Sequence, residues 1–168
     1  VLLRLDVMET TQAPRQAPAL PPLRPEEAVA RGSERSIFEW EAEPALLLKL
    51  IHPQALRRDV RGRATDPLFR RELKAWQAAR RYSARTGRPA PVAEIVAQRA
   101  IEGGFVQLVR KVADAEGRMG PTLDKLIERD AFGAGELALL NALVADLAAA
   151  GIVVHDARPA NFVLETAP

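Results

Sequence analysis

The 168-residue sequence contains no cysteine. Disulfide bonds and thiolate chemistry are therefore excluded, which fits a protein of a reducing compartment. The sequence also lacks any apolar run near the roughly 20 residues that a membrane-spanning helix needs. A secretory leader is not expected either, because Arg4 and Asp6 interrupt the apolar residues at the start. We therefore expect a cytoplasmic protein with no membrane partner.

An excess of one charge is also missing. The 24 basic and 22 acidic residues leave a formal net charge of +2 at pH 7. This balance excludes the strong overall positive charge that is typical of nucleic-acid-binding proteins. What remains is an ordinary globular composition, 48% hydrophobic and 27% charged. The chain is long enough for one domain or for two small lobes that share a core.

Prolines crowd the first part of the chain. Residues 9–28 contain five of them, at positions 14, 18, 21, 22 and 25. Proline interrupts helices and central strands, so we predict a disordered tail over residues 1–28. The chain starts at Val1, and Met8 is a candidate for the natural start. Order is expected to begin near Val29.

Short apolar runs bounded by turn residues predict a sheet. Residues 29–40 are expected to form a strand, a turn of small residues and a second strand, and residues 46–51 a buried third strand. Residues 92–101 and 105–109 are predicted as a hairpin, since Glu102-Gly103-Gly104 is typical of its turn. Residues 152–154 and 162–164 are predicted as two further short strands.

Periodicity and end signals predict two main helices. Asp66 can cap a helix that starts at Pro67, and apolar residues follow at helical spacing. A second helix is predicted from Glu136 to Ala150, with Gly151 at its C-terminal cap. It is so apolar that we expect it to be mostly buried. A short helix is also predicted near Thr122.

Two opposite charges occupy apolar settings. Lys49 is the only charged residue within strand 46–51, and Glu72 falls on the packing side of the helix that begins at Pro67. A buried ammonium is costly unless it meets an anion. One interpretation is that Lys49 faces solvent and Glu72 pairs with a local arginine. The other is that they pair across a cleft, where an ion pair at about 4 Å is worth roughly 4 kcal/mol before desolvation.

The end of the chain carries the most specific motif, Asp156-Ala157-Arg158-Pro159-Ala160-Asn161. Its pattern Asp-x-Arg-Pro-x-Asn resembles the catalytic loop of protein-kinase-like phosphotransferases. A polar loop between two short strands is the alternative, because Asp, Asn and Pro are common loop residues.

In this order, the predicted elements resemble the protein-kinase-like fold and, more closely, the bacterial YrbL family, named for a PhoP regulatory network protein. The resemblance covers about residues 29–165, and the stretch Arg70-Arg71-Glu72-Leu73-Lys74 is its most YrbL-like part. It implies an α+β fold. Residues 29–112 would form an N-terminal antiparallel sheet with one helix, and residues 113–168 a partial helical C-lobe that ends in a hairpin like a catalytic loop.

The resemblance also implies a site for ATP and Mg²⁺. Lys49 would contact the α- and β-phosphates, and Glu72 would anchor it. Gly32 and Ser33 would cover the phosphates, although Ser33-Glu34 stands where a richer glycine pattern is expected. The segment from Val109 to Val112, which includes Lys111, would be the hinge that binds adenine through backbone groups.

The same resemblance gives the terminal loop its roles. Asp156 would orient or deprotonate the attacking hydroxyl, Arg158 would steady the transferring phosphoryl group, and Asn161 would bind Mg²⁺. Kinases place a further metal-binding Asp after this loop, but no Asp follows Asn161 in the sequence. We therefore expect either a truncated chain or a natural short form that does not bind the metal in the usual way.

Two functions follow as expectations. The first is a kinase-like nucleotide-binding protein, with phosphoryl transfer from ATP if a metal-binding Asp exists beyond this chain. The alternative is a non-catalytic pseudokinase-like regulatory module that binds a protein partner. Residues 57–88 also hold eleven basic residues against three acidic ones, a local net charge of +8. A solvated helix face is the favoured interpretation of this segment, and nucleic acid is not the expected partner.

Overall fold

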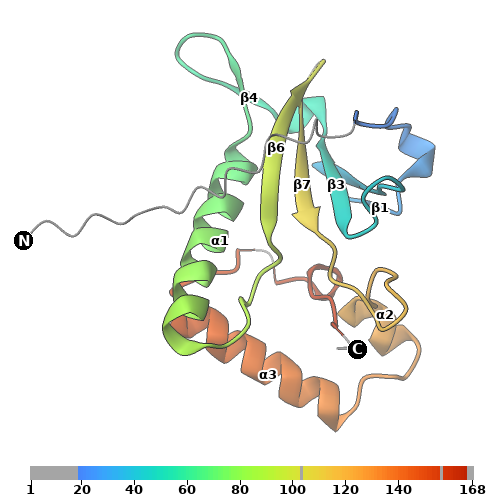
Figure 1. The fold of residues 1–168 in the computed structure, drawn as a ribbon, viewed down its shortest axis with the longest axis vertical. Coiled ribbons are helices and arrows are strands. Elements are labelled where there is room, and N and C mark those ends of the chain that lie inside the picture. Colours follow the sequence, from blue (N-terminus) through green and yellow to red (C-terminus); the bar gives the residue numbers. More distant parts are fainter. Residues whose placement is uncertain (1–18, 103, 156, 166–168) are drawn as a thin grey trace, which may run out of the picture.

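A computed structural model describes residues 19–102, 104–155 and 157–165. Its centre is a five-stranded sheet in the order β1-β2-β3-β7-β6, in which each neighbouring pair is antiparallel (Figure 1). The strands are β1 Ala30–Arg31, β2 Arg35–Glu39, β3 Leu46–Ile51, β6 Ile95–Ile101 and β7 Gly104–Arg110. The predicted α+β class and the predicted hairpin are confirmed.

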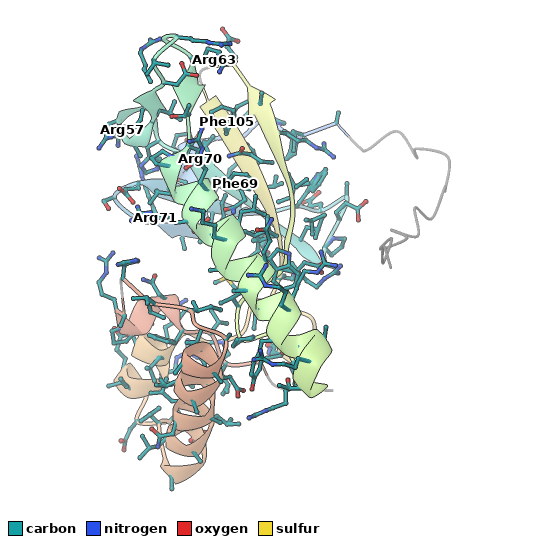
Figure 2. All side chains as sticks on the ribbon, turned by 90° about the vertical axis from the view of Figure 1, so that its left-hand side faces the viewer. Arg57, Arg63, Phe69, Arg70, Arg71 and Phe105 are labelled. Carbon is teal, nitrogen blue, oxygen red and sulfur yellow. The ribbon has the colours of Figure 1, made fainter. Side chains whose placement is uncertain are left out.

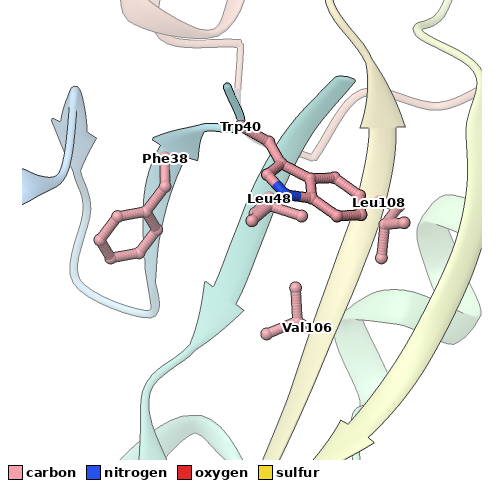
Figure 3. Close-up of a cluster of buried hydrophobic side chains, with 5 residues drawn as sticks. All are labelled: Phe38, Trp40, Leu48, Val106 and Leu108. Atoms are coloured by element: carbon pink, nitrogen blue, oxygen red, sulfur yellow. The ribbon is translucent and has the colours of Figure 1, made fainter. Parts of the chain in front are cut away.

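One face of the sheet holds the hydrophobic core. The other, which we call the polar face, carries Lys49 and Gln107 beside apolar side chains such as Leu47, Ile51 and Val109. Lys49 of β3 pairs with Ile37 on β2 and with Gln107 on β7. Directly opposed residues share a face, so Lys49 and Gln107 point to the same side. The neighbouring positions point to the other side, where five buried side chains form the hydrophobic core (Figure 3). These are Phe38, Trp40, Leu48, Val106 and Leu108.

Residues 19–28 pack against the sheet, although their prolines predicted a disordered tail. Leu20, Leu23 and Ala28 pack against the hydrophobic core, and a 3-10 turn, η1, spans Pro25–Glu27. Prolines exclude regular hydrogen bonding, but they do not prevent the leucines between them from burying apolar surface. The predicted disorder therefore does not extend to residues 19–28. The rest of the predicted tail, residues 1–18, lies outside the described residues.

Helix α1, Pro67–Thr86, covers the polar face of the sheet (Figure 1). The Asp66 carboxylate accepts a hydrogen bond from the Phe69 N–H at 2.9 Å, and Gly87 at φ 71° ends the helix. The predicted start is confirmed. Before the helix, a turn η2, Pro53–Ala55, leads into a hairpin of β4, Arg57–Arg58, and β5, Ala64–Thr65.

Helices α2, Leu123–Glu128, and α3, Ala134–Ala149, form the lower part of the molecule in Figure 1. Gly151, at φ 70°, follows the end of α3 as predicted. The expected burial of α3 is wrong, because Leu147 is its only buried residue. Leu139 is 57% exposed. A helix that is apolar all round gives no sequence signal of which face is covered.

The terminal segment pairs with the residues before α2. Thr122 and Val163 form an isolated bridge, and the Leu164 N–H donates to the Pro121 carbonyl at 3.0 Å. A side chain at Gly120 would collide with the Leu164 carbonyl, so only glycine allows this approach. Of the two short strands predicted here, residues 152–154 form none, and residues 162–164 contribute only the bridge. The loop between them contains a 3-10 turn, η3, at Pro159–Asn161.

Candidate functional site

The structure brings the two predicted charges together. Alternation along β3 points Lys49 toward α1, and Glu72 lies on the side of α1 that faces the sheet. The Lys49 Nζ is 4.0 Å from the Glu72 Oε1. The Lys49 side chain is 26% exposed and that of Glu72 is 39% exposed, so the pair remains open to solvent on one side.

Arg35 of β2 is the closer partner of Glu72. Its Nη1 lies 2.5 Å from the Glu72 Oε2 and donates to the Gln107 Oε1 at 3.0 Å. Its Nη2 lies 3.2 Å from the Asp66 Oδ2, and only 11% of the Arg35 side chain is exposed. One guanidinium thus joins β2 to β7 and to the start of α1. This arginine clamp, Arg35 with Glu72, Asp66 and Gln107, fixes the helix against the sheet.

Sequence reasoning missed Arg35 and Gln107 and saw Asp66 only as a helix cap. A usable signal existed for Arg35. It precedes Ile37 by two residues, so strand alternation places it on the face that Lys49 shares with Ile37 once β2 and β3 are paired in register. No comparable signal identified Gln107 before the pairing of β3 with β7 was known.

Burial and charge shift the pKa of both partners. Burial lowers the pKa of Lys49, with a smaller contribution from nearby Arg35, and the Glu72 carboxylate only partly opposes this. Burial acts to raise the pKa of Glu72, but Lys49 and Arg35 together bring it below its usual value. Glu72 is therefore ionised at neutral pH. The Lys49 ammonium carries a desolvation cost that one more anion would reduce.

Two buried donors next to this pair remain unsatisfied. Within the described part of the chain, the Gln107 Nε2 and the Arg35 Nε have no hydrogen-bond partner of normal geometry. Gln107 is only 1% exposed. Orphaned buried donors are rare and indicate either strain or a missing polar group.

The turn predicted to cover phosphates is held by the end of β3. The Gly32 N–H donates to the Arg35 carbonyl at 2.8 Å, which closes the turn between β1 and β2. The His52 Nδ1 lies 3.2 Å from the Ser33 carbonyl, and its Nε2 lies 2.9 Å from the Ser36 Oγ. Gly32 and Ser33 are both exposed. The turn is therefore accessible to a ligand, and His52 anchors it to the sheet.

The predicted hinge is largely occupied by internal hydrogen bonds. Val109 is buried within β7, at 3% exposure. The Lys111 N–H donates to the Ala45 carbonyl at 2.8 Å, and the Val112 carbonyl accepts from the Gly120 N–H at 3.0 Å. The Lys111 ammonium lies 3.5 Å from the Glu39 carboxylate. Adenine would have to use other backbone groups of this segment or displace these bonds.

The terminal loop lies below the sheet, between α1 and α2 (Figure 1). Arg158 precedes η3 and Asn161 ends it, and both side chains are exposed. Asp156, the predicted catalytic carboxylate, lies outside the described residues. Among the residues that are described, no group of three or more His, Asp or Glu side chains could hold a metal ion.

Comparison with known protein families gives a match over most of the chain. A family model described as PhoP regulatory network protein YrbL matches residues 22–167. Neither the curated proteins nor the solved structures contain a match to the chain. In the described part of the chain, no helix is at once long and apolar enough to cross a bilayer.

Proposed function

The chain belongs to the YrbL family of PhoP regulatory network proteins, and we propose that it binds a nucleotide as protein kinases do. The observation that carries this proposal is the contact between Lys49 on β3 and Glu72 on α1, at 4.0 Å. A lysine on the third strand held by a glutamate of the following helix is how kinases present an ammonium to the phosphates of ATP.

The electrostatics of the cluster favour an anionic ligand. Arg35 already holds the Glu72 carboxylate at 2.5 Å, so Lys49 shares this carboxylate with a second cation. The Lys49 ammonium therefore keeps an unbalanced, partly desolvated charge. A phosphate oxygen beside Lys49 would reduce that cost, and charge-assisted hydrogen bonds of this kind are about twice as strong as neutral ones. The exposed turn at Gly32 and Ser33 lies at the end of the same sheet and would cover the phosphates.

Phosphoryl transfer from ATP requires more than this cluster. Asp156 would orient the attacking hydroxyl, Arg158 would steady the phosphoryl group, and Asn161 would contribute an oxygen ligand to Mg²⁺. A metal-binding carboxylate would still be needed, because no Asp follows Asn161 in the sequence. Catalysis is therefore proposed only for a form of the protein that supplies this group.

Calorimetric titration with ATP and Mg²⁺ tests nucleotide binding. We expect the unchanged protein to bind, and Lys49→Met to weaken binding about tenfold or more, as expected for the loss of one charged hydrogen bond. Since Arg35 would still hold Glu72, Lys49→Met should leave α1 in place. The matched control is Lys125→Met, which removes one exposed ammonium from α2. No heat and no thermal shift at millimolar nucleotide would sink the proposal.

A second candidate is a pseudokinase-like regulatory module that binds a protein partner without catalysis. The observation that favours it is the hinge, where the Lys111 N–H and the Val112 carbonyl are already bonded within the chain. Absence of nucleotide binding would leave this candidate standing. It is rejected if a form of the protein that includes the missing carboxylate hydrolyses ATP and Asp156→Ala abolishes that hydrolysis.

A further inference from the structure

One face of α1 carries a row of cations. Arg70, Lys74 and Arg81 are separated by four and seven residues, so they lie along one side of the helix, and all three are exposed. At 1.5 Å per residue, the row is about 16 Å long. The only acidic residue of α1 is Glu72, which faces the sheet. The solvent face of the helix therefore has no negative charge of its own.

The β4–β5 hairpin extends this row beyond the start of α1. Figure 2 shows Arg57 and Arg63 of the hairpin on the same side of the molecule as Arg70 and Arg71 of the helix. We call the whole set the arginine face. It consists of Arg57, Arg58, Arg61, Arg63, Arg70, Arg71, Lys74 and Arg81, all exposed.

The arginine face is barely neutralised by the rest of the chain. Its one carboxylate, Asp59, is held inside the hairpin by Arg63 at 2.8 Å and by two backbone N–H groups. No other member of the face makes an ion pair within 4 Å to a described residue. Like charges four residues apart, such as Arg70 and Lys74, destabilise a helix. This repulsion makes the unbound helix less stable, whereas an anionic partner would neutralise the charges and remove the repulsion.

In place of the solvated helix face expected from the sequence, we propose that the arginine face binds the phosphodiester backbone of nucleic acid without sequence preference. A row of about 16 Å spans about five phosphates of one strand, at 3.4 Å each. Seven of its eight members are arginines, whose planar fork matches phosphate oxygens. The face lies on the outer side of α1, away from the Lys49 cluster, so this inference does not depend on the proposed nucleotide site.

The composition of the face argues against other anionic partners. Protein interfaces are depleted of charge at their centre and contain an apolar core. The only large apolar side chain exposed within the face is Val60, at the tip of the hairpin. A helix or loop that binds a lipid surface usually carries several exposed apolar side chains that enter the bilayer, and Val60 is a single one.

Fluorescence anisotropy with a short DNA duplex of mixed sequence, at several salt concentrations, tests the inference. We expect binding at low salt. The logarithm of the binding constant should fall linearly with the logarithm of the salt concentration. The variant Arg70→Gln/Lys74→Gln/Arg81→Gln should bind much more weakly, and its salt slope should fall by about 2 to 3, near 0.9 per lost phosphate contact. Its melting temperature should not fall, since the like-charge pairs are removed.

The matched control, Arg31→Gln/Lys125→Gln/Arg129→Gln, removes three exposed positive charges outside the arginine face. It should retain both the affinity for the duplex and the salt slope. If the helix variant does not fold, Arg57→Gln/Arg58→Gln/Arg61→Gln on the hairpin provides the same test. Three results would overturn the inference: no duplex binding at low salt, equal losses in the face and control variants, or binding to anionic lipid vesicles or polyglutamate but not to the duplex.

Discussion

At the scale of single residues, the main competition is between two cations for one carboxylate. Arg35 lies 2.5 Å from Glu72 and Lys49 lies 4.0 Å from it. Arg35 is favoured because its fork can also reach Asp66 and Gln107, whereas an ammonium is a single point of charge. The helix is therefore held by Arg35, and Lys49 is left available for a ligand.

This division of roles predicts a large effect of Arg35 on stability. Arg35→Gln should lower the free energy of unfolding by about 2 to 3 kcal/mol, since it leaves the buried Asp66 carboxylate poorly compensated while Glu72 is partly screened by solvent. Urea denaturation measures this loss. Arg31→Gln, on the exposed neighbouring strand, should change it by less than about 0.5 kcal/mol. Equal midpoints for the two variants would contradict the role of the clamp.

The same residues show how far sequence reasoning reaches at this scale. Lys49 and Glu72 were found because a lone charge in an apolar pattern is visible in one dimension. Gln107 was not found, because an uncharged polar residue between Val106 and Leu108 is unremarkable until β3 lies beside it. Gly120 was missed for the same reason, since the Leu164 carbonyl that excludes a side chain comes from the far end of the chain.

At the scale of elements, the sequence was sufficient to place an element where the residues that define it lie close together in the chain. Asp66, Pro67 and Gly87 define both ends of α1, and each acts within one turn of the helix. Residues 152–154 were predicted as a strand because they form a short apolar run. A strand needs a neighbour, and the segment before α2 accepts only Val163 and Leu164. Propensity could not determine that choice.

The partial burial of α3 predicts an uneven response to truncation of its leucines. Leu147 is 6% exposed, so Leu147→Ala should cost about 2 to 3 kcal/mol through lost burial and a residual cavity. Leu139 is 57% exposed, so Leu139→Ala should change stability by less than about 0.5 kcal/mol. The two denaturation midpoints can be compared directly. Similar losses would mean that a partner covers the outer face of α3 in solution.

At the scale of the whole molecule, the sheet must be covered on both sides. Helix α1 covers the polar side and joins it through the arginine clamp. On the apolar side, the segment from Leu20 to Ala28 packs against the core around Leu48 (Figure 3 shows this core). A sheet with one bare apolar face would expose its core to water, so this proline-rich segment is part of the fold.

Removing the leucine side chains of that segment should therefore weaken the entire domain. Leu20→Ala/Leu23→Ala should lower stability by about 1 to 3 kcal/mol in total, since each leucine is only half-buried and full burial is worth about 1.5 to 3 kcal/mol. The loss should appear in thermal unfolding together with increased binding of an apolar dye to the sheet. Arg24→Ala, directly after Leu23 and exposed, is the control and should change neither signal. If the double variant and the control have the same melting temperature, the segment does not stabilise the sheet, and the core of Phe38, Trp40 and Leu48 is stable without it.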